Sequence, residues 1–228
     1  MRLVIIFALT FTSCTISGIP TQSTSETNQM RYLALGDSYT IGESVAVKER
    51  WPVQLVAMLR AQGFQFDDPQ IIATTGWTTD ELNAGIDRAK LQGTYDLVSL
   101  LIGVNNQYRG RDVNNYRAEF AALLNRAIDF AGGKSSRVLV LSIPDWGVTP
   151  FARGNDRAKI AREIDAFNAV NREETIRAGA RYVDITPESR DAISDAALIA
   201  LDGLHPSGKM YGEWARLALP AAMKAFGK

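Results

Sequence analysis

Short apolar segments alternate with helical patterns along most of this chain, and that alternation restricts its possible folds more than any other feature. Five segments have the length and composition of strands: 31–35, 71–73, 97–102, 138–143 and 181–185. The third, LVSLLI, is typical of a strand that is covered on both faces. Strands that alternate with helices predict an α/β fold, a three-layer α/β/α sandwich with a mostly parallel sheet of about five strands.

The segments between these strands carry the signals of helices. Pro52 stands early in a helical pattern, where its missing N–H costs nothing. Thr78 or Thr79, followed by two acidic residues, marks a second helix start. Further helices are expected over 113–128, from Asn155 or Asp156 onward, and over 211–226. The helix after 155 is predicted to turn Ile160, Ile164, Phe167 and Val170 toward the core and a charged, solvated face outward.

The first 29 residues have the features of a targeting segment rather than of a folded domain. A positive start, an apolar run from Leu3 to Phe11 and the small residues before Cys14 have the layout of a secretory signal over 1–14. The cysteine at this place is similar to the lipidation site of bacterial lipoproteins; the alternative is plain secretion with an incidental cysteine. Residues 15–29 are polar and rich in Ser and Thr, which predicts a flexible tether. We therefore expect an exported domain over 30–228, in the periplasm or at the cell surface, with membrane contact only through an anchor at Cys14.

Charge and residue usage exclude several classes of function. Lys+Arg and Asp+Glu both count 25, so nothing resembles the basic footprint of a nucleic-acid-binding protein. Cys14 is the only cysteine and His205 the only histidine. An internal disulfide is therefore impossible, and a metal site built from Cys or His is not expected. Any mechanism that needs an imidazole must use His205.

A serine follows the first predicted strand, in the segment from Gly36 to Gly42. Ligands of parallel sheets bind beyond the carboxyl ends of the strands. A serine at such a strand-to-helix turn exposes its hydroxyl near backbone N–H groups that can face an oxyanion. The alternative is that Asp37 or Ser38 merely caps a helix. Thr40 stands where the α/β-hydrolase elbow requires its second glycine, so that motif is not matched.

Three further positions complete a candidate site. Asp202 precedes His205 by three residues, so one turn can bring its carboxylate to a ring nitrogen and leave the other nitrogen to accept a hydroxyl proton. The alternative is a polar turn before the last helix, with Ser207 as its cap. Gly76 and Asn105 follow the second and third strands, where a glycine allows close approach to its N–H and an asparagine supplies a neutral donor. Taken singly, each is more often a helix-entry glycine or a turn asparagine.

Together these segments resemble the SGNH (GDSL) hydrolase family, over the chain from about Tyr32 to its end. The family's four marker residues match, in the family's order, Ser38, Gly76, Asn105 and His205. Asp202 matches the acid that the family carries three residues before the histidine. Asn106 stands where the family usually carries Asp, a position that supports the loop rather than the chemistry.

The resemblance implies hydrolysis of esters in a shallow, loop-lined site, without a metal or organic cofactor. It implies that Ser38 is the nucleophile, that His205 is its general base and that Asp202 orients the imidazole. The oxyanion hole would consist of the Ser38 N–H, the Gly76 N–H and the Asn105 side chain.

The substrate remains open between several classes. Short acyl esters, lysophospholipids and related lipid esters are the leading expectation, with a carbohydrate O-acetylesterase or an acyl thioesterase as the alternative. A different class is an inactive cell-surface binding module. Four aromatic residues in loops after strands can line an acyl or sugar pocket, although packing beneath the loops is the more common fate of such residues: Trp77, Tyr108, Trp146 and Phe151. No oligomeric state is predicted.

Overall fold

A five-stranded, wholly parallel sheet forms the centre of the molecule. The computed structural model describes Met1 and residues 29–228. The strands are β1 (Tyr32–Gly36), β2 (Gln70–Ala73), β3 (Leu97–Leu101), β4 (Val138–Leu141) and β5 (Arg181–Val183). Their order across the sheet is β2-β1-β3-β4-β5, and every neighbouring pair is parallel. The predicted α/β fold is therefore confirmed, including the number of strands.

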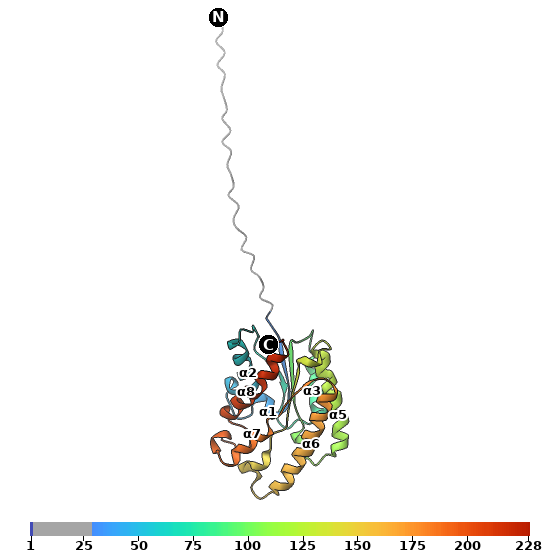
Figure 1. Ribbon diagram of the computed structural model, residues 1–228, viewed down its shortest axis with the longest axis vertical. Coiled ribbons are helices and arrows are strands. Elements are labelled where there is room, and N and C mark those ends of the chain that lie inside the picture. Colours follow the sequence, from blue (N-terminus) through green and yellow to red (C-terminus); the bar gives the residue numbers. More distant parts are fainter. Residues whose placement is uncertain (2–28) are drawn as a thin grey trace.

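Helices cover both faces of the sheet (Figure 1). One layer holds α1 (Ser38–Ile41), α2 (Trp51–Ala61), α7 (Thr186–Arg190) and α8 (Gly208–Lys224). The other holds α3 (Thr79–Ala89), α5 (Val113–Phe130) and α6 (Arg157–Arg177), while the short α4 (Val104–Tyr108) follows β3. Six 3₁₀ helices lie in the connections: Val47–Glu49, Ser135–Arg137, Trp146–Val148, Pro150–Ala152, Asp191–Ile193 and Ala196–Leu198.

The helix boundaries follow the local signals, with one difference. Thr78 caps α3, and Asp156 caps α6 through a hydrogen bond from the Lys159 N–H. The last helix was expected from 211 but begins at Gly208, because the hydroxyl of Ser207 caps it. The cap adds three residues ahead of the apolar pattern that marks the helix in the sequence. The four apolar residues predicted to face the core from α6 are all buried.

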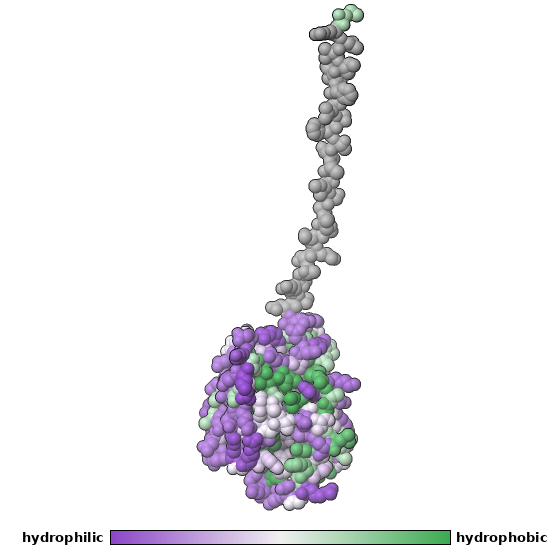
Figure 2. Space-filling view, turned by 180° about the vertical axis from the view of Figure 1, so that it is seen from behind, coloured by the Kyte–Doolittle hydropathy of each residue, from purple (hydrophilic) through white to green (hydrophobic). Residues whose placement is uncertain are grey.

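The inner strands β1, β3 and β4 are covered on both faces, and all four residues of β4 are buried. All five residues of β1 and all five of β3 are buried, as a sheet with helices on both faces requires. The surface is mixed: Figure 2 shows hydrophilic residues over much of one face, with hydrophobic residues in separate groups between them. None of the helices among the described residues has the length and apolarity needed to cross a bilayer.

The chain enters the domain at the amino ends of the strands. Met30 forms an isolated bridge with Phe66, just before β1 begins. Residues 2–28, which include Cys14, most of the predicted signal and nearly all of the predicted tether, lie outside the described residues.

Candidate active site

The candidate residues meet at the point where the strand order reverses. The chain leaves β1 and β3, which are neighbours in the sheet, toward helices on opposite faces of it. Such a switch point opens a crevice beyond the carboxyl ends of the strands. Ser38, Gly76 and Asn105 follow β1, β2 and β3, and His205 reaches the same crevice from the loop before α8.

The Ser38 turn, residues 36–42, places a hydroxyl just beyond the carboxyl end of β1. Asp37 caps α1 by accepting a hydrogen bond from the Tyr39 N–H (3.1 Å), and Ser38 is the first residue of that helix. The N–H of a first helical residue has no partner within its helix. The helix ends after four residues at Gly42, whose φ of 68° is left-handed. The helix cap that the sequence offers as the alternative is therefore present, at Asp37, and Ser38 follows it as the first residue of α1.

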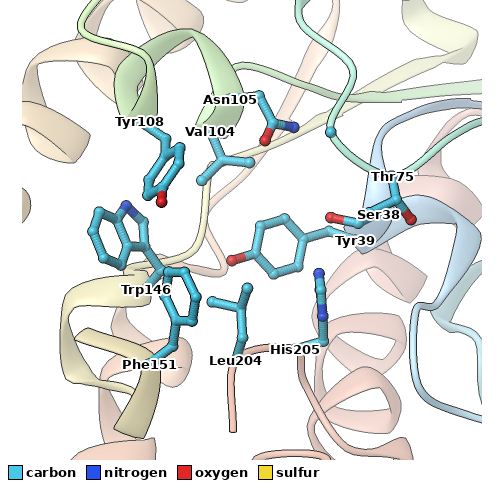
Figure 3. Close-up of a pocket in the computed structure, with 11 residues that line it drawn as sticks. Ser38, Tyr39, Thr75, Val104, Asn105, Tyr108, Trp146, Phe151, Leu204 and His205 are labelled. Carbon is cyan, nitrogen blue, oxygen red and sulfur yellow. The ribbon is translucent and has the colours of Figure 1, made fainter. Parts of the chain in front are cut away.

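Gly76, in the loop after β2, and Asn105, in α4, belong to two segments that are hydrogen-bonded to each other. The Asn105 side chain donates to the carbonyl of Trp77 (2.9 Å), and the carbonyl of Gly76 accepts from Arg109 (2.7 Å). Only one of the two amide hydrogens of Asn105 is used in this way, and the amide nitrogen lies on the side of Ser38 (Figure 3). Gly76 has a φ of 85°, a conformation that favours glycine.

Asn106 has the supporting role that the sequence predicts for it. Its side chain is fully buried, accepts from the Thr79 N–H (3.1 Å) and donates to the Thr79 hydroxyl (2.7 Å). These bonds tie α4 to the start of α3, and so hold the loops of Asn105 and Gly76 together.

Gly103 allows α4 to begin where it does. Its φ is 125°, and a Cβ atom at this position would lie 2.4 Å from the Tyr116 hydroxyl and 2.8 Å from Ile143. No side chain fits there without displacing the packed groups around the end of β3. The placement of Asn105, two residues later, depends on this glycine.

The Asp202 carboxylate is held by four hydrogen bonds. His205 donates through Nδ1–H at 2.6 Å, and the backbone N–H groups of Leu204 and His205 donate at 2.9 Å each. Ser44 donates its hydroxyl at 2.6 Å. Burial raises the pKa of Asp202, but the hydrogen bonds from Ser44 and His205 outweigh it and hold that pKa well below its usual range. The group is therefore a carboxylate at neutral pH.

Ser44 is the functional candidate that sequence reasoning missed. It is one of only two non-glycine residues with a left-handed backbone in residues 29–228, with a φ of 65°. Such a backbone costs free energy and is concentrated at functional sites. No motif marks this serine, since 158 residues separate it from its partner Asp202. The neighbouring Glu43 accepts a hydrogen bond from Thr75, so the same short segment contacts both the Gly76 loop and the Asp202 loop.

A second aspartate beside Ser38 is in the opposite electrostatic state. Asp37 is fully buried, and its Oδ2 has no hydrogen-bond partner among the described residues. Burial raises the pKa of Asp37 to about 7, against smaller lowering effects of backbone hydrogen bonds. The low dielectric around the carboxyl disfavours its charged form.

The pocket at the switch point brings four of the five predicted site residues together (Figure 3). It has a volume of about 150 Å³ and is lined by Ser38, Tyr39, Thr75, Gly76, Val104, Asn105, Tyr108, Trp146, Phe151, Leu204 and His205. The fifth, Asp202, lies behind the ring of His205. With Nδ1 bonded to Asp202, the ring's other nitrogen, Nε2, lies toward Ser38. An alcohol, an imidazole and a carboxylate are thus arranged in series, with candidate oxyanion donors on the far side of the alcohol.

Three of the four loop aromatics line this pocket, contrary to the expectation that they pack beneath loops. Tyr108 and Phe151 are about half exposed, at 56% and 47%, and Trp146 is buried. Their ring centroids lie 5.4 to 6.2 Å apart. Trp77 alone follows the expectation, because its ring packs on Gly85, where an added Cβ would lie 2.3 Å from it.

Comparisons with known proteins agree with this architecture. The model of the GDSL-like lipase/acylhydrolase family matches residues 34–212. Among solved structures, TesA has a TM-score of 0.65 at 18% identity, with 86% of this chain and 99% of that chain covered. A lipase/acylhydrolase from Enterococcus faecalis has a TM-score of 0.62 at 20% identity, covering 84% and 94%. Axe2, an acetylxylan esterase from Geobacillus stearothermophilus, has a TM-score of 0.61 at 19% identity, covering 87% and 94%. A search among curated proteins found no similar sequence.

Proposed function

Because the chain belongs to the GDSL-like lipase/acylhydrolase family and is a carboxylic ester hydrolase, we propose that it works through an acyl-enzyme intermediate on Ser38. In this proposal His205 is the general base, Asp202 orients its ring, and Ser38, Gly76 and Asn105 supply the oxyanion hole. The observation that carries the proposal is the single pocket in which Ser38, Gly76, Asn105 and His205 meet, with Asp202 bonded to the ring from behind.

Acylation begins when the Ser38 Oγ attacks the carbonyl carbon of the ester. The hydroxyl proton passes to His205 Nε2, and the carbonyl oxygen becomes an oxyanion that accepts from the Ser38 N–H, the Gly76 N–H and the Asn105 amide. The bond between carbon and the alcohol oxygen then breaks, and His205 returns its proton to the departing alcohol. Asp202 remains ionised throughout and stabilises the imidazolium.

Deacylation repeats these steps with water. A water molecule attacks the carbonyl carbon of the acyl-enzyme while His205 accepts its proton. Collapse of the second tetrahedral species breaks the bond to the Ser38 Oγ, which recovers the proton from His205. The products are an alcohol and a carboxylic acid, and the chain's own residues account for every proton transfer.

Covalent labelling tests the proposal directly. A fluorophosphonate probe is expected to form one adduct per chain, and peptide mapping is expected to locate it at Ser38. Ser38→Ala should abolish the adduct, whereas Ser136→Ala, a change of the same type at an exposed serine away from the pocket, should retain it. A folded wild-type protein that takes no label would overturn the proposal and leave an inactive binding module as the better account.

We also propose that the domain is exported and anchored at Cys14. The position of Met30 supports an accessible site, because it lies at the amino ends of the strands and the pocket lies at their carboxyl ends. Incorporation of labelled palmitate that Cys14→Ser abolishes is the expected result. If the wild type and Cys14→Ser were recovered equally in the soluble fraction, and neither carried labelled palmitate, the proposed anchor would be contradicted.

A further inference from the structure

The candidate catalytic residues line one side of the pocket, and apolar residues line the other. Ser38, Gly76, Asn105 and His205 make up the first; Val104, Tyr108, Trp146, Phe151 and Leu204 make up the second, and none of these five is charged. We infer that this second half, the acyl cage, holds the acyl group of the ester and favours chains of about six carbons over acetyl groups. The inference rests on the proposed function and names its substrate class.

The arrangement around Ser38 assigns the acyl group to the cage. In the tetrahedral species the carbonyl carbon carries four groups: the Ser38 Oγ, the oxyanion, the leaving oxygen and the acyl chain. The oxyanion must face the side of Asn105, and the leaving oxygen must face His205, which protonates it. Figure 3 shows Asn105 and His205 on opposite sides of the Ser38 hydroxyl and the aromatic rings on a third side. The acyl chain is the one group left for that third side.

The size of the cavity sets the preferred length. The whole pocket, including the side of Ser38 and His205, has a volume of about 150 Å³, and an engineered apolar cavity of about that size in another protein binds benzene, a ring of six carbons. An acetyl group would leave most of the cage unfilled. A chain of about ten carbons would have to extend past Phe151 and Tyr108, the two half-exposed rings.

Two polar groups beside the cage are already used within the protein, so a sugar would find there mainly the hydroxyls of Tyr39 and Tyr108. The indole N–H of Trp146 donates to Gln107 (2.8 Å), and the Thr75 hydroxyl donates to Glu43. A sugar ring brings several hydroxyls, and each that is desolvated without a partner costs binding free energy. The rings also meet one another at steep angles, 73° for Tyr108 with Trp146 and 64° for Trp146 with Phe151, so they form a corner rather than a flat platform.

The inner wall of the cage is rigid and the outer wall is adjustable. Trp146 is held by its bond to Gln107, and its 3₁₀ helix is capped by Asp145, which is also paired with Arg190 (2.9 Å). Phe151 is exposed enough to be replaced without leaving a buried cavity. It is therefore the position at which chain-length preference can be changed without unfolding the protein.

The test is a series of p-nitrophenyl esters from acetate to dodecanoate, which share one leaving group. For the wild type we expect kcat/KM to rise by up to about fourfold per added methylene as far as hexanoate, the factor that corresponds to burying about 0.8 kcal/mol of CH₂. It should fall again by decanoate. Acetylated xylo-oligosaccharide should be hydrolysed at least about tenfold less efficiently than the hexanoyl ester.

Phe151→Ala should move the optimum toward longer chains, raising the ratio of decanoate to hexanoate activity about tenfold, and Tyr108→Ala should change it in the same direction. Ile176→Ala removes an exposed apolar side chain of α6 away from the pocket and serves as the matched control, with an unchanged profile. Melting temperatures establish that each variant is folded.

The outcomes separate this inference from the proposed function. Labelling of Ser38 together with acetate as the best ester, faster turnover of the acetylated sugar, or a profile that Phe151→Ala leaves unchanged would overturn the acyl cage alone. Absence of both labelling and ester turnover would overturn the proposed function and the cage with it.

Discussion

The turns after β1, β2 and β3 and the loop that carries Asp202 and His205 reach one pocket by different routes. The turns begin directly at strand ends, so the sheet fixes the positions of Ser38, Gly76 and Asn105. The Asp202 loop, residues 200–207, begins 17 residues after β5 ends and follows α7 and two 3₁₀ helices. A bridge between Ile199 and Pro206 closes it. Individual hydrogen bonds hold it to the site: the Ser44 hydroxyl donates to Asp202, and the Phe151 N–H donates to the Gly203 carbonyl (2.9 Å).

The sheet itself therefore positions the residues of the proposed oxyanion hole. The proposed acid–base pair, Asp202 and His205, is positioned by a separate loop that is hydrogen-bonded to the site. The two aspartates express the same contrast. Asp37 is buried inside the fold, and burial raises its pKa to about 7. Asp202 lies in the partly exposed loop, and hydrogen bonds to its carboxylate lower its pKa. Two aspartates thus differ in charge, one favouring the neutral acid because it is desolvated and the other the carboxylate because it is surrounded by donors.

The largest effect is expected from a change in the acid–base pair of Asp202 and His205. Asp202→Asn removes the charge that stabilises the imidazolium and permits the wrong ring tautomer, so kcat should fall by about 10⁴-fold with little change in KM. Steady-state kinetics on the hexanoyl ester measure it. Asp37→Asn is the matched control within the fold, and its kcat should stay within a few-fold of the wild type. Equal losses in the two variants would remove the distinction between the two sides.

A smaller loss is expected from the oxyanion side. Asn105→Ala deletes one donor to the oxyanion and should lower kcat by about 10²- to 10³-fold. Asn106→Ala is the neighbouring control: it should lower the melting temperature, because its buried bonds to Thr79 are lost, and reduce kcat less. A rate unchanged by Asn105→Ala would exclude that side chain from the oxyanion hole.

Ser44 connects the two regions, because it follows the Ser38 turn in the chain and its hydroxyl donates to Asp202. Ser44→Ala should lower kcat about tenfold without raising KM, because the lost hydrogen bond positions Asp202 and does not touch substrate. Ser44→Gly loses the same bond but accepts the left-handed backbone, so it should match the alanine variant in kcat and exceed it in stability. If glycine restored the activity, backbone strain rather than the hydroxyl would be the important property.

The last effect is on stability rather than on rate, and it distinguishes the aspartates by the sign of their pH dependence. Between about pH 4 and pH 7 the unfolded chain has lost the Asp37 proton while the folded chain retains it. The free energy of unfolding of the wild type should therefore fall with rising pH relative to Asp37→Asn, by up to about 4 kcal/mol. For Asp202, whose pKa is lowered, the stabilisation is present above about pH 4 and is lost as the pH falls. Urea unfolding of the wild type, Asp37→Asn and Asp202→Asn from about pH 2 to about pH 8 tests both, and parallel curves for the wild type and Asp37→Asn would contradict the raised pKa.

The sequence by itself determined the fold and the positions of the candidate site along the chain. Apolar strand runs and helix caps are local signals, and a parallel sheet brings its strand ends to one edge, so Ser38, Gly76 and Asn105 could be predicted to meet. The pairing of Asp202 with His205 was also local, within one turn. Only the tertiary structure brought in Ser44 and formed the cage of Tyr108, Trp146 and Phe151, because those contacts join loops from distant parts of the chain. No local pattern encodes how such loops pack, and the substrate preference of the site depends on that packing.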